Sequence, residues 1–279
     1  MIFDCAGKSL DLSVPGIMGI VNVTPDSFSD GGKFFSADAA LQHALKLVED
    51  GADILDIGGE STRPGSEAVP LQQEIDRISP VIEAIRAEID VPISIDTMKA
   101  EVMRAAVNAG AGLINDVNAL RSENALQTAA ELDVPVCLMH MQGTPQTMQS
   151  EPHYDDVVTE VEHFLLERVA ECEKAGIKAE KIMLDPGFGF GKRARHNLRL
   201  MKHLSRLTAL PYPVLVGVSR KSIIGDMLKV SVDERLAGSL SLASIAVWQG
   251  AKLIRTHDVK ETAQAVKLSH HVKQVADFD

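Results

Sequence analysis

The chain has 279 residues, of which 45% are hydrophobic and 24% charged, and its formal net charge is −11. These values are ordinary for a soluble globular protein, and no apolar stretch approaches the roughly 20 residues that span a bilayer. The negative charge argues against a nucleic acid or an anionic membrane as a partner, because both bind to a basic face.

The amino terminus and the cysteines predict a cytoplasmic protein. The first residues lack the basic segment and apolar core of a signal peptide. Cys5, Cys137 and Cys172 are far apart and have no CxxC spacing, which disfavours a disulfide framework and a zinc site.

The first predicted element is a β-hairpin over 2–14, which we expect to cover the floor of the fold. Eight short apolar runs follow, and nearly all end in a polar or charged residue. Such runs are typical of strands buried on both faces. They cover 17–22, 54–56, 93–96, 113–115, 136–140, 182–185, 214–219 and 253–257.

Helices are predicted between these strands, over 36–50, 71–89, 98–109, 122–133, 154–175, 195–209, 231–249 and 258–275. Ser36 and Asp38 are start signals for the first helix, Thr97 is one for the third, and Asp233 lies in the first turn of the seventh. Left-handed glycine caps are predicted at Gly51, Gly110, Gly176 and Gly250.

Eight strands alternating with helices predict parallel βαβ units that close into an α/β fold, the (β/α)8 TIM barrel. No linker divides the chain, so we expect a single domain over 1–279. Active sites of such barrels lie at the carboxyl ends of the strands. The residues expected there, which indicate an enzyme, are Asn22, Asp56, Asp96, Asn115, His140, Asp185, Ser219, Lys221, Arg255 and His257.

Two long loops, 22–32 and 58–65, follow the first two strands on this face. Long loops in compact domains are usually functional, and paired glycines allow them to move as lids. We expect both loops to close over a bound substrate.

The glycine-rich segment 185–192 fits neither common nucleotide-binding motif. A Walker loop would need glycine at Pro186 and serine or threonine at Arg193, and the dinucleotide motif would need glycine at position 192. What remains is a turn that presents Asp185, Phe188 and Phe190.

Asp96, Asn115 and Asp185 end three strands, so their side chains can converge in one pocket. Each alone could equally cap the following helix. Together they can accept hydrogen bonds from the amino and ring N–H groups of a flat heterocycle and donate one to its carbonyl. This pattern fits the edge of a pterin or a guanine.

Cations at the ends of the last two strands predict an anion site. Ser219-Arg-Lys221 follows one strand and Arg255-Thr-His257 ends the other, where barrels frequently bind phosphate. Two cations and an imidazole fit a diphosphate better than a single carboxylate. Asn22 is either a turn residue or a Mg²⁺ ligand, with substrate phosphates and water completing the coordination shell.

Other polar residues look structural. His140, between Met139 and Met141, fits a hydrogen-bonded core histidine better than a catalytic one. No Ser-His-Asp or Cys-His arrangement is legible, so nucleophilic covalent catalysis has little support.

Seven segments resemble bacterial dihydropteroate synthases, in the order of that family and through essentially the whole chain. Phe188, where the family often has an aliphatic residue, and the basic segment 192–195 are minor departures. The segments are NVTPDSFSDGG (22–32), DIGGESTRPG (56–65), SIDT (94–97), IND (114–116), DPGFGFG (185–191), GVSRK (217–221) and RTHD (255–258).

The resemblance implies a transferase that joins 4-aminobenzoate to 6-hydroxymethyl-7,8-dihydropterin diphosphate, releasing diphosphate and forming 7,8-dihydropteroate for folate synthesis. It implies sulfonamide binding, Mg²⁺ on Asn22, and an SN1-like loss of diphosphate. The implied pterin diphosphate contacts are Thr62, Asp96, Asn115, Asp185, Lys221, Arg255 and His257. The implied 4-aminobenzoate contacts are Phe28, Thr62, Arg63, Pro64, Phe190, Ser219 and Ser222. The implied catalytic residues are Asp30, Asp96, Asp185, Lys221, Arg255 and His257.

Two other functions use the same scaffold. A methyltransferase that binds a reduced folate would share the carboxylates and Asn115 but would need no diphosphate site and no Mg²⁺. A catalytically silent pterin-binding paralogue would lack Lys221 or the long loops. The family is usually dimeric, and the helix at 231–249, with Trp248, is the candidate homodimer face.

Overall fold

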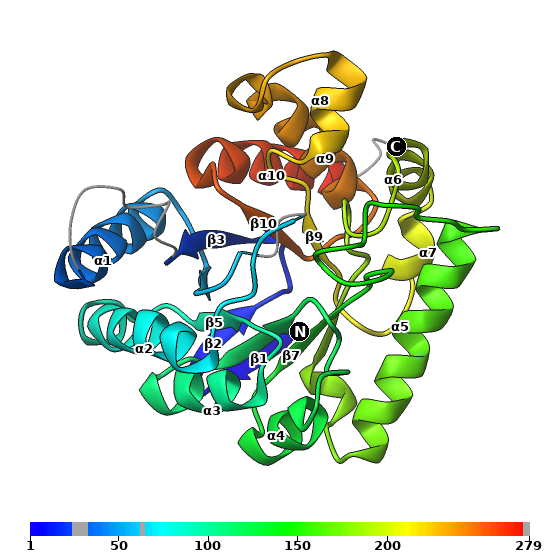
Figure 1. Cartoon of the computed structure of the whole chain (residues 1–279). Coiled ribbons are helices and arrows are strands. Elements are labelled where there is room, and N and C mark those ends of the chain that lie inside the picture. The colour runs from blue at the N-terminus through cyan, green and yellow to red at the C-terminus, as the bar shows by residue number, and fades with distance from the viewer. Residues whose placement is uncertain (24–32, 62–64, 276–279) are drawn as a thin grey trace.

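A ring of strands surrounded by helices makes up the fold (Figure 1). The structure, a computed structural model, describes residues 1–23, 33–61 and 65–275, with the backbone alone over 33–36. Its strands are β1 (Ile2–Cys5), β2 (Lys8–Asp11), β3 (Gly16–Asn22), β4 (Ile54–Gly58), β5 (Ile93–Asp96), β6 (Leu113–Asp116), β7 (Val136–Met139), β8 (Ile182–Asp185), β9 (Leu215–Gly217) and β10 (Leu253–Thr256).

The helices follow the strands in alternation. They are α1 (Lys33–Glu49), α2 (Leu71–Glu88), α3 (Ala100–Ala109), α4 (Ala125–Leu132), α5 (Val157–Lys174), α6 (Ala194–Lys202), α7 (Ser205–Thr208), α8 (Ser222–Leu228), α9 (Leu236–Trp248) and α10 (Val259–Gln274), with short 3-10 helices η2 (Ala179–Lys181) and η3 (Val232–Glu234).

The main sheet has eight parallel strands in the order β8-β7-β6-β5-β4-β3-β10-β9. Its two edge strands meet at a bridge between Leu184 and Val214, and the Leu184 amide donates to the Pro213 carbonyl at 2.9 Å. This contact closes the ring, so the predicted TIM barrel is confirmed.

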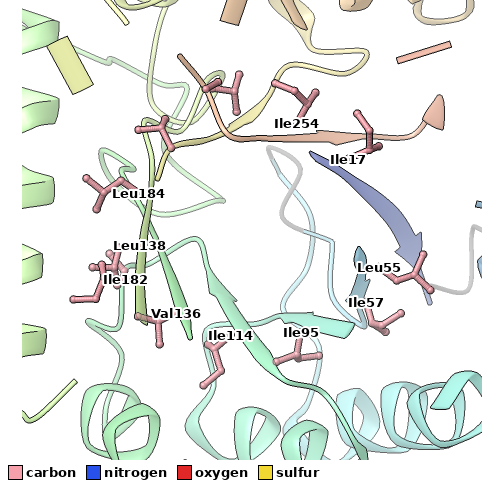
Figure 2. Close-up of a cluster of buried hydrophobic side chains, with 14 of the residues drawn as sticks. Ile17, Leu55, Ile57, Ile95, Ile114, Val136, Leu138, Ile182, Leu184 and Ile254 are labelled. Atoms are coloured by element: carbon pink, nitrogen blue, oxygen red, sulfur yellow. The ribbon is translucent and has the colours of Figure 1, made fainter. Parts of the chain in front are cut away.

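Alternate strand residues face the surrounding helices. Figure 2 shows Leu55, Ile57, Ile95, Ile114 and Ile182 on the outer side of the ring, within one large buried cluster. Because successive strand residues point to opposite faces, the residues between them point into the barrel.

The hairpin of β1 and β2 packs against the amino-terminal ends of the barrel strands. Its buried side chains join inward-facing strand residues in what we call the floor cluster. The cluster consists of Phe3, Cys5, Leu10, Leu12, Met18, Ile54, Leu113, Cys137, Met183, Leu215 and Leu253. The packing is close: a Cβ on Gly112 would lie 2.2 Å from the Cys5 carbonyl oxygen. The predicted hairpin and its place at the floor are therefore confirmed.

Several predicted boundaries were wrong. Helix α1 begins at Lys33, so Ser36 and Asp38 lie inside it and do not mark its start. The predicted helix at 195–209 is two helices, α6 and α7, and Asp233 belongs to η3 and not to α9. Helix α8 was missed, because seven residues are too few to show a helical period.

The predicted glycine caps are confirmed. The four glycine caps at Gly51, Gly110, Gly176 and Gly250 all have the predicted positive φ, between 99° and 117°. All three cysteines are buried and unpaired, in agreement with the absence of a disulfide framework.

Candidate active site

The inner face of the barrel changes from apolar to polar two residues beyond the floor cluster. On β4 the sequence passes from Ile54 to Asp56, and on β10 it passes from Leu253 to Arg255. The same step occurs on β6 and β8. The polar residues at this level, which we call the rim cluster, are Asp56, Asp96, Asn115, Asp185 and Arg255.

Arg255 joins two carboxylates of the rim cluster. Its Nε donates to Asp56 Oδ2 at 2.5 Å, and its Nη2 donates to Asp96 Oδ2 at 2.8 Å. Burial alone would lower the pKa of Arg255, but the charges of Asp56 and Asp96 outweigh it and raise that pKa. The guanidinium is therefore fixed in place as a permanent cation.

Asp56 organises this cluster from a fully buried position. Its Oδ1 accepts from Ser94 Oγ at 2.5 Å, and its Oδ2 accepts from Asn115 Nδ2 at 3.1 Å. The sequence predicted Asp56 at the rim but not among the site residues. Its position two residues after a floor residue, shared with Asn115 and Arg255, was the signal that could have included it.

Asp96 presents a free acceptor in the rim cluster. Its Oδ1 is buried and has no hydrogen-bond partner in the described part of the chain. Burial raises the pKa of Asp96 to about 7, although the Arg255 charge opposes that rise. An unpaired buried acceptor is costly, so this atom is suited to an N–H donor from a ligand.

Asp185 ends β8 and is held by its own turn. Its Oδ1 accepts from the Gly187 amide at 2.7 Å. Burial raises the pKa of Asp185 to about 6, opposed by that backbone hydrogen bond and by the charge of Lys221.

Lys221 lies just before α8, close enough to Asp185 and Asp96 for their charges to act on it. Its Nζ is 4.1 Å from the centroid of the Phe190 ring, and within the described residues it has no ion pair. Burial and the charge of Arg255 lower the pKa of Lys221 to about 8. Unlike Arg255, this cation forms no ion pair with a carboxylate of the described residues, although the charges of Asp185 and Asp96 oppose the fall in its pKa.

Ser219 and His257 contact each other at the ends of the last two strands. Ser219 Oγ and His257 Nδ1 are 3.0 Å apart, and the His257 amide donates to Ser219 Oγ at 3.2 Å. Arg220, which lies between Ser219 and Lys221 in the sequence, does not join the site. Its side chain forms an ion pair with Asp258 at 2.5 Å. Ser222 is exposed at the start of α8.

The structure therefore brings together Asp96, Asn115, Asp185 and Arg255, and it brings Lys221 next to Phe190 and His257 next to Ser219. Asn22 stands at the carboxyl end of β3. Phe28, Asp30, Thr62, Arg63 and Pro64 lie outside the described residues, as do the parts 24–32 and 62–64 of the two predicted lids.

Asn22 offers one amide oxygen to a cation. Its Oδ1 lies 3.9 Å from where a Cβ on Gly58 would stand, as does Asp96 Oδ2, so both side chains border the same small space. Among the described residues, no group of three or more His, Cys, Asp and Glu side chains is arranged to hold a metal. The donors fit Mg²⁺ only where substrate and water supply most of its ligands.

His140 and Lys192 lie behind the site and contact each other. His140 is buried, and its Nδ1 is 2.8 Å from Lys192 Nζ, which confirms the structural interpretation of this histidine. Burial lowers the pKa of Lys192 to about 7. Lys192 was expected in a basic segment, and nothing in the sequence indicated its burial.

Comparisons with known proteins agree with this geometry. Residues 18–257 match the family model of the pterin binding enzymes. The chain is 53% identical over 262 residues to the dihydropteroate synthase of Escherichia coli strain K12, covering 94% of this chain and 93% of the relative. The chain belongs to the dihydropteroate synthase family.

Solved structures of dihydropteroate synthases share the whole fold. The Xanthomonas albilineans enzyme with 4-aminobenzoic acid has 52% sequence identity and a TM-score of 0.93, covering 99% of each chain. The same enzyme in complex with 7,8-dihydropteroate has a TM-score of 0.90 at 49% identity, covering 99% of this chain and 100% of that one. The Yersinia pestis enzyme in a sulfonamide complex has a TM-score of 0.94 at 49% identity, with the same coverage.

As a dihydropteroate synthase, the chain is an enzyme of the transferase class, and the predicted family, fold and activity are confirmed. None of the helices in the described ranges is long and apolar enough to cross a membrane.

Proposed function

We propose that the rim cluster binds the pterin ring of 6-hydroxymethyl-7,8-dihydropterin diphosphate during dihydropteroate synthesis. The observation that carries this proposal is the buried, unpartnered Oδ1 of Asp96. A pterin presents ring N–H and amino donors beside a carbonyl. Asp96 and Asp185 can accept from the donors, while Asn115 and Lys221 can donate to the acceptors.

The diphosphate would lie toward the cations of the last two strands. Lys221 has no carboxylate partner among the described residues, so its ammonium is available to an anion. His257, beside Ser219 at 3.0 Å, and Arg255 add donors on neighbouring strand ends. These three residues are proposed to stabilise negative charge that develops on the leaving diphosphate.

The difficult step is cleavage of the carbon–oxygen bond to the diphosphate. The anionic carboxylates of Asp96 and Asp185 face the pterin ring and stabilise positive charge that spreads into it as this bond breaks. The amine of 4-aminobenzoate is neutral and needs little deprotonation before it attacks. The reaction is therefore proposed to be SN1-like, with Asp30 as a further catalytic residue.

The 4-aminobenzoate is proposed to bind against Phe190, Ser219 and Ser222, with Phe28, Thr62, Arg63 and Pro64. Thr62 is also proposed to contact the pterin diphosphate. The Xanthomonas albilineans relative with 4-aminobenzoic acid and the Yersinia pestis relative with a sulfonamide support this side of the site and support sulfonamide binding by this chain.

Mg²⁺ is proposed to bind at Asn22 together with the substrate diphosphate. When bound, it would neutralise part of the diphosphate charge. The protein's contribution is to hold Asn22 at the end of β3, next to the space that Asp96 also borders.

The assembly is proposed to be a single domain over 1–279 that forms a homodimer. The support is an exposed apolar surface on the adjacent helices α9 and α10, where Trp248 is 55% and Leu268 67% exposed. Aromatic and aliphatic side chains of this kind are typical of dimer interfaces. Three buried, unpaired cysteines support a reducing compartment, the cytoplasm.

The test supplies the purified protein with the pterin diphosphate and Mg²⁺, with and without 4-aminobenzoate, and measures diphosphate and dihydropteroate. Stoichiometric formation of both only with 4-aminobenzoate is the expected result. Asp96→Asn should weaken binding of the pterin diphosphate by about tenfold in calorimetry, the effect of one charged hydrogen bond. Asp90→Asn, an exposed residue at the floor end, is the control. Unchanged affinity in Asp96→Asn would refute its role.

A further inference from the structure

Lys192 is a buried lysine for which the proposed reaction has no use. It is 3% exposed, and it lies near the end of the loop that leads from β8 to α6. Lysine is almost never fully buried unless it is paired. Its ammonium group has no hydrogen bond to a carboxylate in the described ranges, so other acceptors have to satisfy its N–H donors.

The ammonium group of Lys192 is held mainly by backbone carbonyls. Its Nζ donates to the carbonyls of Gly187 at 2.9 Å, Phe190 at 3.0 Å and His140 at 3.3 Å, and it lies 2.8 Å from His140 Nδ1. Four acceptors surround three N–H donors. All of its hydrogen-bonding capacity is used, so Lys192 itself cannot contact a substrate.

These acceptors lie on two segments of the chain, the loop after β8 and the residue that follows β7. Gly187 and Phe190 lie on the loop itself, whereas His140 directly follows β7. The two backbones are in close contact, because a Cβ on Gly187 would lie 2.0 Å from the His140 carbonyl oxygen. The ammonium group thus fastens the loop after β8 to the end of β7.

The loop in turn presents Phe190 to the site. The Phe190 amide donates to the Gly187 carbonyl at 3.1 Å, and the ring lies 4.1 Å from Lys221 Nζ. Asp185 also interacts with this network, because it accepts from the Gly187 amide and the charge of Lys192 opposes the rise in its pKa that burial causes. Its backbone, however, is fixed in β8 by the ladder with β7. Removing Lys192 should therefore displace the ring more than the carboxylate.

We propose that Lys192 is a positioning residue that sets the place of the Phe190 ring, and thereby the affinity for the second substrate, from behind the site. This inference rests on the proposed placement of 4-aminobenzoate against Phe190. Under this proposal Lys192 contacts neither substrate, yet it affects the binding of 4-aminobenzoate and not that of the pterin diphosphate.

The test compares Lys192→Met, which removes all three donors, with Lys192→Gln, which keeps an N–H₂ group. Lys192→Met should raise KM for 4-aminobenzoate by about tenfold, the scale of one charge-assisted hydrogen bond. The Kd for the pterin diphosphate, measured by calorimetry without 4-aminobenzoate, should stay within about twofold of the parent value. Lys192→Gln should lie between, and Lys202→Met, on the exposed end of α6, should match the parent.

A double-mutant cycle separates positioning from a general loss of structure. In a Phe190→Leu background the ring is absent, so Lys192→Met should add less than about twofold to the KM for 4-aminobenzoate. Additive effects would overturn the proposal, as would an equal loss of pterin diphosphate affinity. If neither Lys192 variant folds, Lys192 is a folding residue and the proposal is wrong. Failure of the parent to bind 4-aminobenzoate would instead refute the proposed function.

Discussion

The floor cluster and the rim cluster share the strands β4, β6, β8 and β10, on each of which a floor residue and a rim residue lie two positions apart, and they have opposite chemistry. Ile54 and Leu253 at the floor are buried among apolar side chains of the hairpin, whereas Asp56 and Arg255 at the rim are bound to each other. Both layers face the inside of the barrel and both are largely buried.

Because of this difference, we expect the floor cluster to contribute mainly to stability and the rim cluster mainly to activity. Burial of apolar side chains at the floor contributes to the free energy of folding. Burial of like-charged carboxylates at the rim opposes folding, and one arginine compensates only part of that cost. Variants of the two layers should therefore affect different measurements.

The largest expected effect comes from Arg255→Ala, which should lower kcat/KM by on the order of a hundredfold, the usual scale for one charge-stabilising group. It should also lower the free energy of unfolding by about 3–5 kcal/mol, because Asp56 and Asp96 lose their shared cation. Lys221→Ala should cause a similar loss of kcat/KM without that loss of stability, since Lys221 has no ion pair within the described residues. Steady-state kinetics and urea unfolding of both variants would check this contrast.

Phe3→Ala tests the floor alone. Loss of this fully packed aromatic ring should lower the free energy of unfolding by about 3–5 kcal/mol. The kcat/KM of the folded protein, assayed well below the unfolding transition, should remain at the parent value. A large loss of kcat/KM at that temperature would mean that the two layers are coupled.

Gly112→Ala should have a smaller effect on the same layer. The added Cβ would lie 2.2 Å from the Cys5 carbonyl oxygen, so the hairpin has to shift away from the barrel. We expect a loss of about 1–3 kcal/mol, as for other overpacked positions. Thermal unfolding measures this loss of stability. Gly7→Ala is the comparison, because Gly7 has a positive φ and open space around it, so this variant introduces backbone strain without a clash.

The rim also differs from the floor in its expected pH dependence. Burial raises the pKa of Asp96 to about 7 and that of Asp185 to about 6, above their unfolded value of 3.8. The folded state therefore holds more protons than the unfolded state between these values, and this contribution to stability falls as the pH rises from about 4 to about 7.

Activity should change in the opposite direction over that range, because the proposed role of these carboxylates needs their charged form. Urea unfolding and kcat/KM measured from pH 5 to pH 8 would check both trends. Asp185→Asn should lessen the decline in stability, whereas Phe3→Ala should keep it. Parallel rise of activity and stability would contradict the assignment.

Most of the barrel was predictable because its strands are buried on both faces. Each inward residue at the rim ends an apolar run, so Asp96, Asn115, Asp185 and Arg255 were found from their spacing alone. Asp56 was placed correctly but undervalued, because its partners lie on three other strands and only the closed ring brings them together.

Other features left no pattern along the chain. The ammonium group of Lys192 is bound by carbonyls that every residue carries, so no side-chain motif marks its site. Helix α8 is one short segment packed beside α6, and its seven residues show no period of their own. Arg220 was expected among the site cations, but a positive φ of 55° accompanies its turn toward Asp258.

The hairpin beneath the barrel also restricts the route by which substrates and products enter and leave. Its side chains close the amino-terminal end with apolar contacts, so substrates and products have to pass through the opposite end. A pterin bound as proposed on the rim cluster would lie nearest the floor, and 4-aminobenzoate would enter above it. The pterin, which binds first, thus becomes part of dihydropteroate, which leaves last. Release of dihydropteroate is therefore a candidate for the step that limits turnover.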